Sequence, residues 1–234
     1  MNNVRTVSDT KRTFYSLHTR PINSIYRRVV EELMVEMHLL SVNVDFRYDP
    51  IYGLGVVTSF NRFMQGYRPE RDKEPIFDAL CQAVGDKTEQ YKQDAQRLEE
   101  LAKRLPGKEI VAWLNPTADT RGASELHDAA VKAIANHTQF KYSRLFAIGL
   151  YTLLELADPD LVKDEKQRIE ALRHICLGLS LPEDKLLKDL EFYRSNLEKM
   201  AQIRLVMEDA LVAERKKRER SADKGVVAAP PNSP

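Results

Sequence analysis

The chain has 234 residues, of which 43% are hydrophobic and 30% charged, and its formal net charge is +1. This length can bury a sizeable core in one large or two small domains, and the near-neutral charge excludes a global field that would recruit nucleic acid or anionic lipid. The two cysteines, Cys81 and Cys176, are too few for a disulfide framework and predict free thiols in a reducing compartment.

The first third of the chain predicts amphipathic helices separated by prolines. Ser8 can cap a short helix that ends near Leu17. Asp49-Pro50 and Glu74-Pro75 each open a further helix, because proline is tolerated in the first turn of a helix but not in its interior. Between the short helix and Asp49, a long helix beginning at Asn23 is predicted by apolar residues at helical spacing over about six turns, namely Ile25, Val29, Val30, Leu33, Met37, Leu40 and Val44.

The middle of the chain continues this pattern. Residues 88–105 predict a highly charged helix, and Pro106 to Leu114 a short one. Ala123–Thr138 and Tyr142–Ala157 predict an antiparallel pair whose second member is the more apolar and therefore the more central. Asp164–Leu179 predicts one more helix. Because strand alternation is absent, we expect an all-α, multi-helix bundle in which Gly53 and Gly55 allow a close approach of two helices.

The C-terminal region differs in length from the other segments. After Pro182 no helix breaker occurs until Gly225, which predicts a helix of about 41 residues and roughly 60 Å. A compact chain of this length has a diameter of about 45 Å, so we expect the helix to protrude. The expected domains are a helical bundle body at residues 1–181, the long helix at 182–224 packing partly on the body, and a disordered tail at 225–234. A coiled-coil-like seam is predicted along the helix, at Leu186, Leu190, Tyr193, Leu197, Met200, Arg204, Met207 and Leu211.

No catalytic motif is found. No histidine has a glutamate three residues before it, so the Glu-x-x-His motif of di-iron bundles is missing. Gly53-Leu54-Gly55 begins like a dinucleotide fingerprint but has no preceding strand. Glu170 and His174 are interpreted as a surface pair on one helix face. We therefore predict a protein that is not an enzyme and has no catalytic, cofactor-binding or metal-binding residues.

Two regions are candidates for partner binding. One is a basic N-terminal face with Arg20, Arg27 and Arg28, for which a solvated helix surface is the alternative interpretation. The other is the outer half of the long helix, where an apolar stripe has less of the body to pack against. Its candidate residues are Ile203, Val206, Met207 and Leu211.

Four runs of sequence resemble a known family. They are TVSDTKRTFY (Thr6–Tyr15), HTRPINSIYRRVVEELMVEMHLLSVN (His18–Asn43), YDPIYGLGVVTSFNRFMQGY (Tyr48–Tyr67) and IFDALCQAVG (Ile76–Gly85). These runs resemble the thylakoid formation / photosystem II biogenesis family of oxygenic phototrophs, in its cyanobacterial type without a transit peptide. The resemblance implies a monomeric, non-enzymatic accessory protein that lies peripherally on the cytoplasmic side of the thylakoid membrane.

The same resemblance implies specific partners. Proteins of this kind bind and maintain the FtsH protease complex and support photosystem II assembly and repair, without a nucleic acid or a cofactor. Two alternatives remain open at this stage. One is a pigment- or lipid-binding helical carrier at the thylakoid membrane that uses Leu145–Leu154 as a pocket, and the other is a phosphate- or metal-dependent hydrolase.

Overall fold

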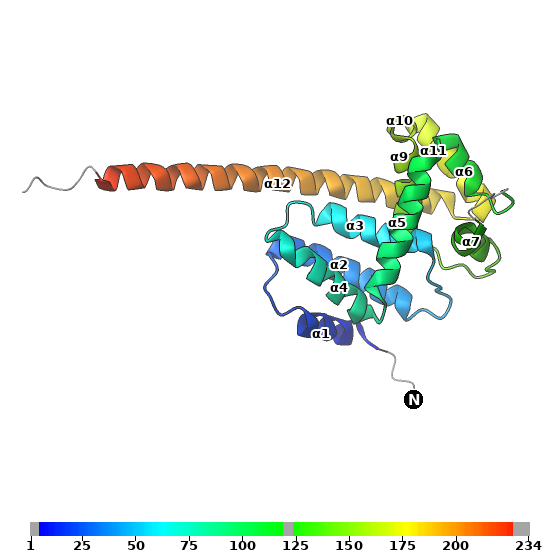
Figure 1. The fold of residues 1–234 in the computed structure, drawn as a ribbon, viewed down its shortest axis with the longest axis horizontal. Helices are drawn as coiled ribbons and strands as arrows, with labels where there is room; N and C mark the ends of the chain where they lie inside the picture. Colours follow the sequence, from blue (N-terminus) through cyan, green and yellow to red (C-terminus); the bar gives the residue numbers. More distant parts are fainter. Residues whose placement is uncertain (1–4, 119–123, 227–234) are drawn as a thin grey trace, which may run out of the picture. The chain divides into compact units, whose positions relative to one another are not determined.

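The computed structural model describes residues 5–118 and 124–226, and every regular element within these ranges is helical (Figure 1). The predicted all-α class is therefore confirmed. The chain divides into two compact units, Met1–Tyr193 and Arg194–Pro234. Among the described helices, none combines the length and the apolar character that crossing a membrane requires.

The α-helices follow the predicted order, with one addition. In chain order they are α1 (Val7–Leu17), α2 (Ser24–Ser41), α3 (Pro50–Phe63), α4 (Lys73–Val84), α5 (Thr88–Arg104), α6 (Gly107–Trp113), α7 (Ser124–His127), α8 (Ala133–Ala135), α9 (Arg144–Ala157), α10 (Pro159–Lys163), α11 (Glu165–Leu179) and α12 (Glu183–Val226). A π-helical turn, Asp128–Lys132, joins α7 to α8. The addition is α10, which follows α9 directly because Pro159 is compatible with the first turn of a helix.

Side-chain caps set the first residue of several helices. The side chains of Asn23, Asp49 and Asp164 each accept a hydrogen bond from a backbone amide in the first turn of α2, α3 and α11. The predicted cap of α1 is wrong by two residues. Thr6, not Ser8, caps α1, because Thr6 and Asp9 form a reciprocal capping box.

The centre of the first unit is the contact between α3 and α9. A Cβ atom on Gly55 would lie 1.7 Å from the carbonyl oxygen of Leu145, and one on Gly149 would lie 1.9 Å from that of Ile51. The two backbones therefore touch, as expected for Gly55. Gly53 instead faces the ring of Tyr48. The expected pairing of α9 with the helix before it is wrong, since α9 packs chiefly on α3 and also contacts α5.

Helix α12 begins in the first unit and continues into the second. Leu186, Leu190 and Tyr193 are buried, and Tyr193 packs edge-on against Phe63 of α3 at 5.8 Å between ring centroids. The seam continues beyond Tyr193 with half-buried side chains at Leu197, Met200, Arg204 and Met207. The helix ends at Val226, two residues after the predicted end, and residues 227–234 of the expected tail lie outside the described residues. The expected domain boundaries and protrusion remain predictions.

Candidate functional site

The cysteines are buried, and two of the histidines contact neighbouring groups of the chain. Burial raises the pKa of Cys81 to about 12 and that of Cys176 to about 11. His38 is buried in hydrogen-bond contact with the hydroxyl of Thr10, and His174 contacts the backbone carbonyl of Glu170 instead of its carboxylate. Over residues 5–118 and 124–226, no group of three or more His, Cys, Asp or Glu side chains could hold a metal ion.

The first unit carries an open surface groove of about 980 Å³. Helix α2 forms one wall, the first turns of α12 form the other, and α1 and the start of α9 complete the lining. The lining residues are Lys11, Ser24, Arg27, Arg28, Glu31, Glu32, Val35, Glu36, Leu39, Arg144, Lys185, Asp189 and Phe192. We call this surface the α2–α12 groove.

Helical periodicity places one side of α2 in the core and another side along the groove. Val30, Leu33, Met34 and Met37 are buried on one side of the helix. Ser24, Arg28, Glu31, Val35 and Leu39 follow the same spacing of three to four residues on the groove side, where the helix faces solvent. The predicted stripe is therefore correct at its centre. It is wrong at Val44, which is 81% exposed because α2 ends at Ser41.

A partly buried ion pair lies in the lining of the groove. The guanidinium of Arg144 donates to the Glu36 carboxylate at 2.5 Å and lies over the ring of Phe192, 5.3 Å from its centroid. Burial raises the pKa of Glu36, and the charge of Arg144 opposes that shift. This contact connects α2, α9 and α12 through three side chains.

A second polar contact fixes the opposite wall. The hydroxyl of Tyr142 donates to the Asp189 carboxylate at 2.8 Å, while the ammonium group of Lys185 lies 5.1 Å from the centroid of the Tyr142 ring. The first turns of α12 therefore have their groove-facing charges engaged within the first unit. This arrangement positions Phe192 on the groove wall without burying it.

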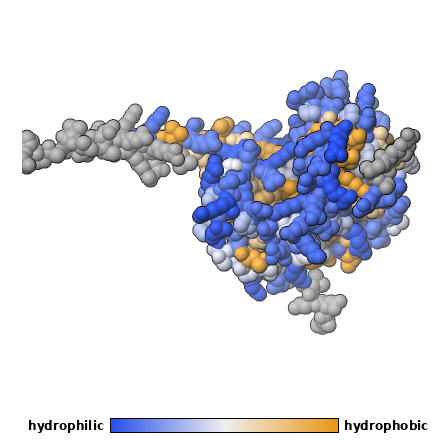
Figure 2. Space-filling model, viewed as in Figure 1, coloured by the Kyte–Doolittle hydropathy of each residue, from blue (hydrophilic) through white to orange (hydrophobic). Residues whose placement is uncertain are grey.

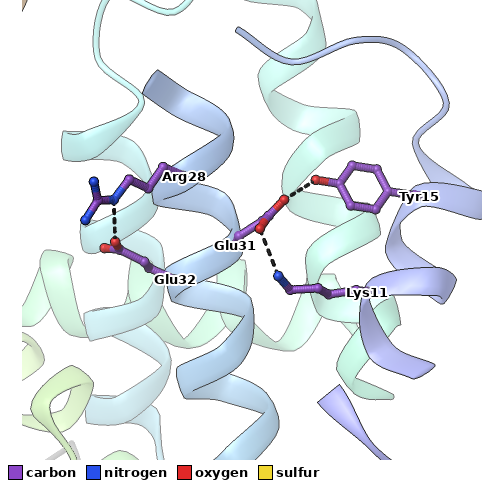
Figure 3. A network of polar contacts seen from close by, with 5 residues as sticks. All are labelled: Lys11, Tyr15, Arg28, Glu31 and Glu32. Atoms are coloured by element: carbon purple, nitrogen blue, oxygen red, sulfur yellow. Dashed lines mark hydrogen bonds and ion pairs between the residues drawn. The ribbon is translucent and has the colours of Figure 1, made fainter. Parts of the chain in front are cut away.

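Figure 3 shows the polar network on α2 and its neighbour α1. Glu31 accepts hydrogen bonds from the ammonium group of Lys11 at 2.9 Å and from the hydroxyl of Tyr15 at 2.6 Å. These two bonds lower the pKa of Glu31, whereas burial and the bond to Glu31 raise the pKa of Tyr15 to about 12. Arg28 pairs with Glu32 one turn further along the exposed face of α2, at 2.9 Å.

The three arginines of the predicted basic face do not lie on one surface. Arg27 and Arg28 both line the groove. Arg20 does not, because its guanidinium forms an ion pair with the buried Asp72 at 2.8 Å. Local sequence could not show this contact, since the two residues are 52 positions apart.

The predicted residues of the long helix lie in the second unit. Ile203 and Val206 are exposed and Met207 is half-buried, while the side chain of Leu211 lies outside the described residues. Figure 2 shows apolar side chains along the described surface of α12, interspersed with hydrophilic ones. Their role in partner binding stays a prediction.

The sequence interpretation missed the apolar side chains of the groove. Leu39 is 57% exposed and Phe192 is 52% exposed, and the two lie on opposite walls of one groove. A signal was present for both. Leu39 lies beside the apolar stripe of α2, and Phe192 lies between the seam residues Leu190 and Tyr193 of α12.

Comparisons with known proteins give consistent matches over nearly the whole chain. A family model described as Thylakoid formation protein matches residues 6–222. Protein Thf1 of Nostoc sp. (strain PCC 7120) is 64% identical over 233 residues, covering 99% of this chain and all of that protein. Protein Thf1 of Nostoc punctiforme is 63% identical, covering 100% of this chain and 99% of that protein. A solved structure of Psb29 matches with a TM-score of 0.79 at 46% identity, covering 92% of this chain and 99% of that one.

Proposed function

The chain belongs to the thylakoid formation protein family, and we propose that it is a non-enzymatic accessory protein of photosystem II biogenesis and repair. In this proposal it binds and maintains the membrane-anchored FtsH protease complex, together with photosystem II assembly or repair components. It acts as a monomer, peripherally on the cytoplasmic side of the thylakoid membrane.

The observation that carries the proposal is the family match along residues 6–222. The relatives named Thf1 and the structural neighbour named Psb29 extend over nearly the entire chain, so the proposal concerns the whole protein. Its surface supports a binding role in two places. The α2–α12 groove exposes Leu39 and Phe192, and α12 exposes Val206.

Affinity isolation from solubilised thylakoids, followed by mass spectrometry, tests this function. The full chain used as bait should recover FtsH subunits and photosystem II assembly components, and an unrelated helical bait of similar charge should not. A bait that recovers neither group from active thylakoids would remove the proposal.

The packing of α9 gives the carrier alternative no support. A carrier that used Leu145–Leu154 would need a cavity beside them, and these side chains are buried against neighbouring helices. At Gly149 the backbone of α9 touches that of α3. Protein purified from its native source should therefore contain no near-stoichiometric pigment or lipid, as measured by absorbance and by lipid extraction.

A further inference from the structure

We infer that the α2–α12 groove is the docking site for one amphipathic α-helix of a protein partner. The bound helix places apolar side chains against Val35, Leu39 and Phe192 and a carboxylate near Arg27. The inference rests on the proposed function only in taking a thylakoid protein as the source of that helix.

The walls of the groove determine the conformation of the ligand. Both walls are helices, so neither offers the free backbone donors and acceptors with which a sheet edge binds an extended peptide. Ridges of side chains on two helices instead accept the ridges of a third helix. The groove face of α2 runs from Ser24 to Leu39, a distance of about 22 Å, which corresponds to about four turns of a bound helix.

Exposed apolar side chains stand on both walls. The half-buried Val35 and the exposed Leu39 are four residues apart on α2, and the exposed Phe192 lies on α12. Leu39 and Phe192 each leave more than half of their surface in contact with water. Each is followed in its helix by a residue that is buried in the core. A helix with apolar residues three or four positions apart would cover these side chains and remove that surface from water.

The charges of the groove favour a bound helix with an acidic side chain near one end. Five basic and four acidic side chains line it, and the four acidic ones have partners within the chain: Glu31 with Lys11, Glu32 with Arg28, Glu36 with Arg144 and Asp189 with Tyr142. Arg27 forms no ion pair with any described carboxylate, and its charge acts on Glu31 only through space. Arg27 also lies in the first turn of α2, where the helix dipole adds positive potential. A partner carboxylate is therefore favoured at this end.

The same charges disfavour other ligands. The lining carries only one more basic than acidic side chain, which attracts the anionic headgroups of a lipid surface far less than a cluster of several unpaired cations would. A small molecule is favoured by a concave site that encloses most of its surface, whereas the α2–α12 groove is open along its length. A protein helix fits the length and the apolar contact points together with the two lining cations, Arg27 and Lys185, that form no ion pair with a described carboxylate.

Site-specific photo-crosslinking of the full chain tests the inference. A benzophenone amino acid replaces Leu39 in one variant and Phe192 in another, and each is irradiated with solubilised thylakoid membranes. Leu177 of α11, which is 72% exposed and does not line the groove, carries the probe in the control variant. We expect both groove variants to crosslink the same partner segment, one with apolar residues at helical spacing and an acidic residue near one end.

Other crosslinking results overturn the inference. Adducts to lipid, to a second copy of this chain, or to segments without helical spacing identify a different occupant. Adducts no more abundant than those at Leu177 show that no partner occupies the groove.

Substitution measures the contribution of the groove and separates this inference from the proposed function. Leu39→Glu and Arg27→Glu should each reduce recovery of the crosslinked partner at least tenfold, while Leu177→Glu leaves it unchanged. Circular dichroism verifies that all three variants are folded. If the natural chain recovers FtsH subunits but neither groove variant crosslinks a partner more than the Leu177 control does, the groove inference fails and the proposed function stands. If the crosslinked helix comes from another thylakoid protein and FtsH is never recovered, the groove inference stands and the proposed function fails.

Discussion

Asp49 lies at the start of α3, where capping and burial act in opposite directions on the charge of its carboxyl group. Its side chain caps the helix by accepting a hydrogen bond from the amide of Tyr52 at 2.8 Å, which favours the carboxylate. Burial disfavours the same charge and raises the pKa of Asp49 to about 7. Because this folded-state pKa lies above the unfolded value of about 3.9, the folded chain binds the proton more tightly. The resulting stability is present below pH 4 and is lost as the pH rises to about 7.

Asp49→Asn should remove this pH dependence. Asparagine retains an oxygen that can cap α3 but carries no titrating proton. The natural chain should lose up to about 1.4 kcal/mol of unfolding free energy per pH unit between about pH 4 and 7, relative to the variant. Urea denaturation at several pH values measures the difference. Asp164→Asn, at the exposed cap of α11, is the matched control and should leave that slope unchanged; equal slopes for the natural chain and Asp49→Asn would contradict the prediction.

The two cysteines should be inert while the chain is folded. Alkylation requires the thiolate, and burial both restricts access and raises the pKa of Cys81 and Cys176 far above neutral. Iodoacetamide at pH 7.5 should label neither thiol at the rate seen in urea-unfolded protein, where both react. Mass spectrometry of timed samples measures this, and rapid modification of either cysteine in the native chain would count against its buried position.

At the scale of helices, the first unit depends on the backbone contact between α3 and α9. Gly55 and Gly149 each face a carbonyl of the opposite helix, so that α9, the most apolar helix, packs against α3 without intervening side chains. The aromatic rings of Tyr48, Tyr52 and Tyr91 join α3 to α5 beside this contact, with centroids between 5.1 and 6.1 Å apart. The geometry of the core therefore depends on two glycines more than on any one apolar side chain.

Gly149→Ala should destabilise the chain by about 1–3 kcal/mol, because the new methyl group would overlap the Ile51 carbonyl and force the helices apart. Gly178→Ala is the matched control in α11. The nearest atom to its added Cβ is 3.9 Å away, so this change should raise stability by up to about 1 kcal/mol through helix propensity. Thermal and urea unfolding of both variants measure the contrast. A Gly149→Ala variant as stable as the natural chain would show that the backbones are not in contact.

At the scale of the whole molecule, the buried side chains among the described residues all belong to the first unit. Beyond Tyr193, no described side chain of α12 is fully buried, although the seam continues in half-buried form. The distal helix thus adds little to the free energy of unfolding of the core. Its exposed apolar residues are available for a second contact, separate from the α2–α12 groove.

Deletion of residues 201–234 should leave a folded monomer and weaken partner capture. Among the residues that the structure describes, the deletion removes none that is buried, and it takes away Ile203, Val206 and Met207. Circular dichroism and light scattering measure fold and mass, and the thylakoid affinity isolation measures capture. A truncated chain that captures the partner as well as the full one would assign binding to the first unit, where Arg27 and Arg28 line the groove.

The sequence by itself determined most of the helices, though not α10, because their signals are local. Asn23 and Asp49 cap the helices that they were expected to begin, and the unbroken segment after Pro182 forms one helix. Only the tertiary structure decided which faces meet. Gly149 contacts Ile51, Arg20 pairs with Asp72, and Leu39 and Phe192 come to line one groove across 153 positions of sequence. Helical periodicity identifies the apolar side of each helix, but the identity of its neighbour depends on long-range packing, which determined the candidate site.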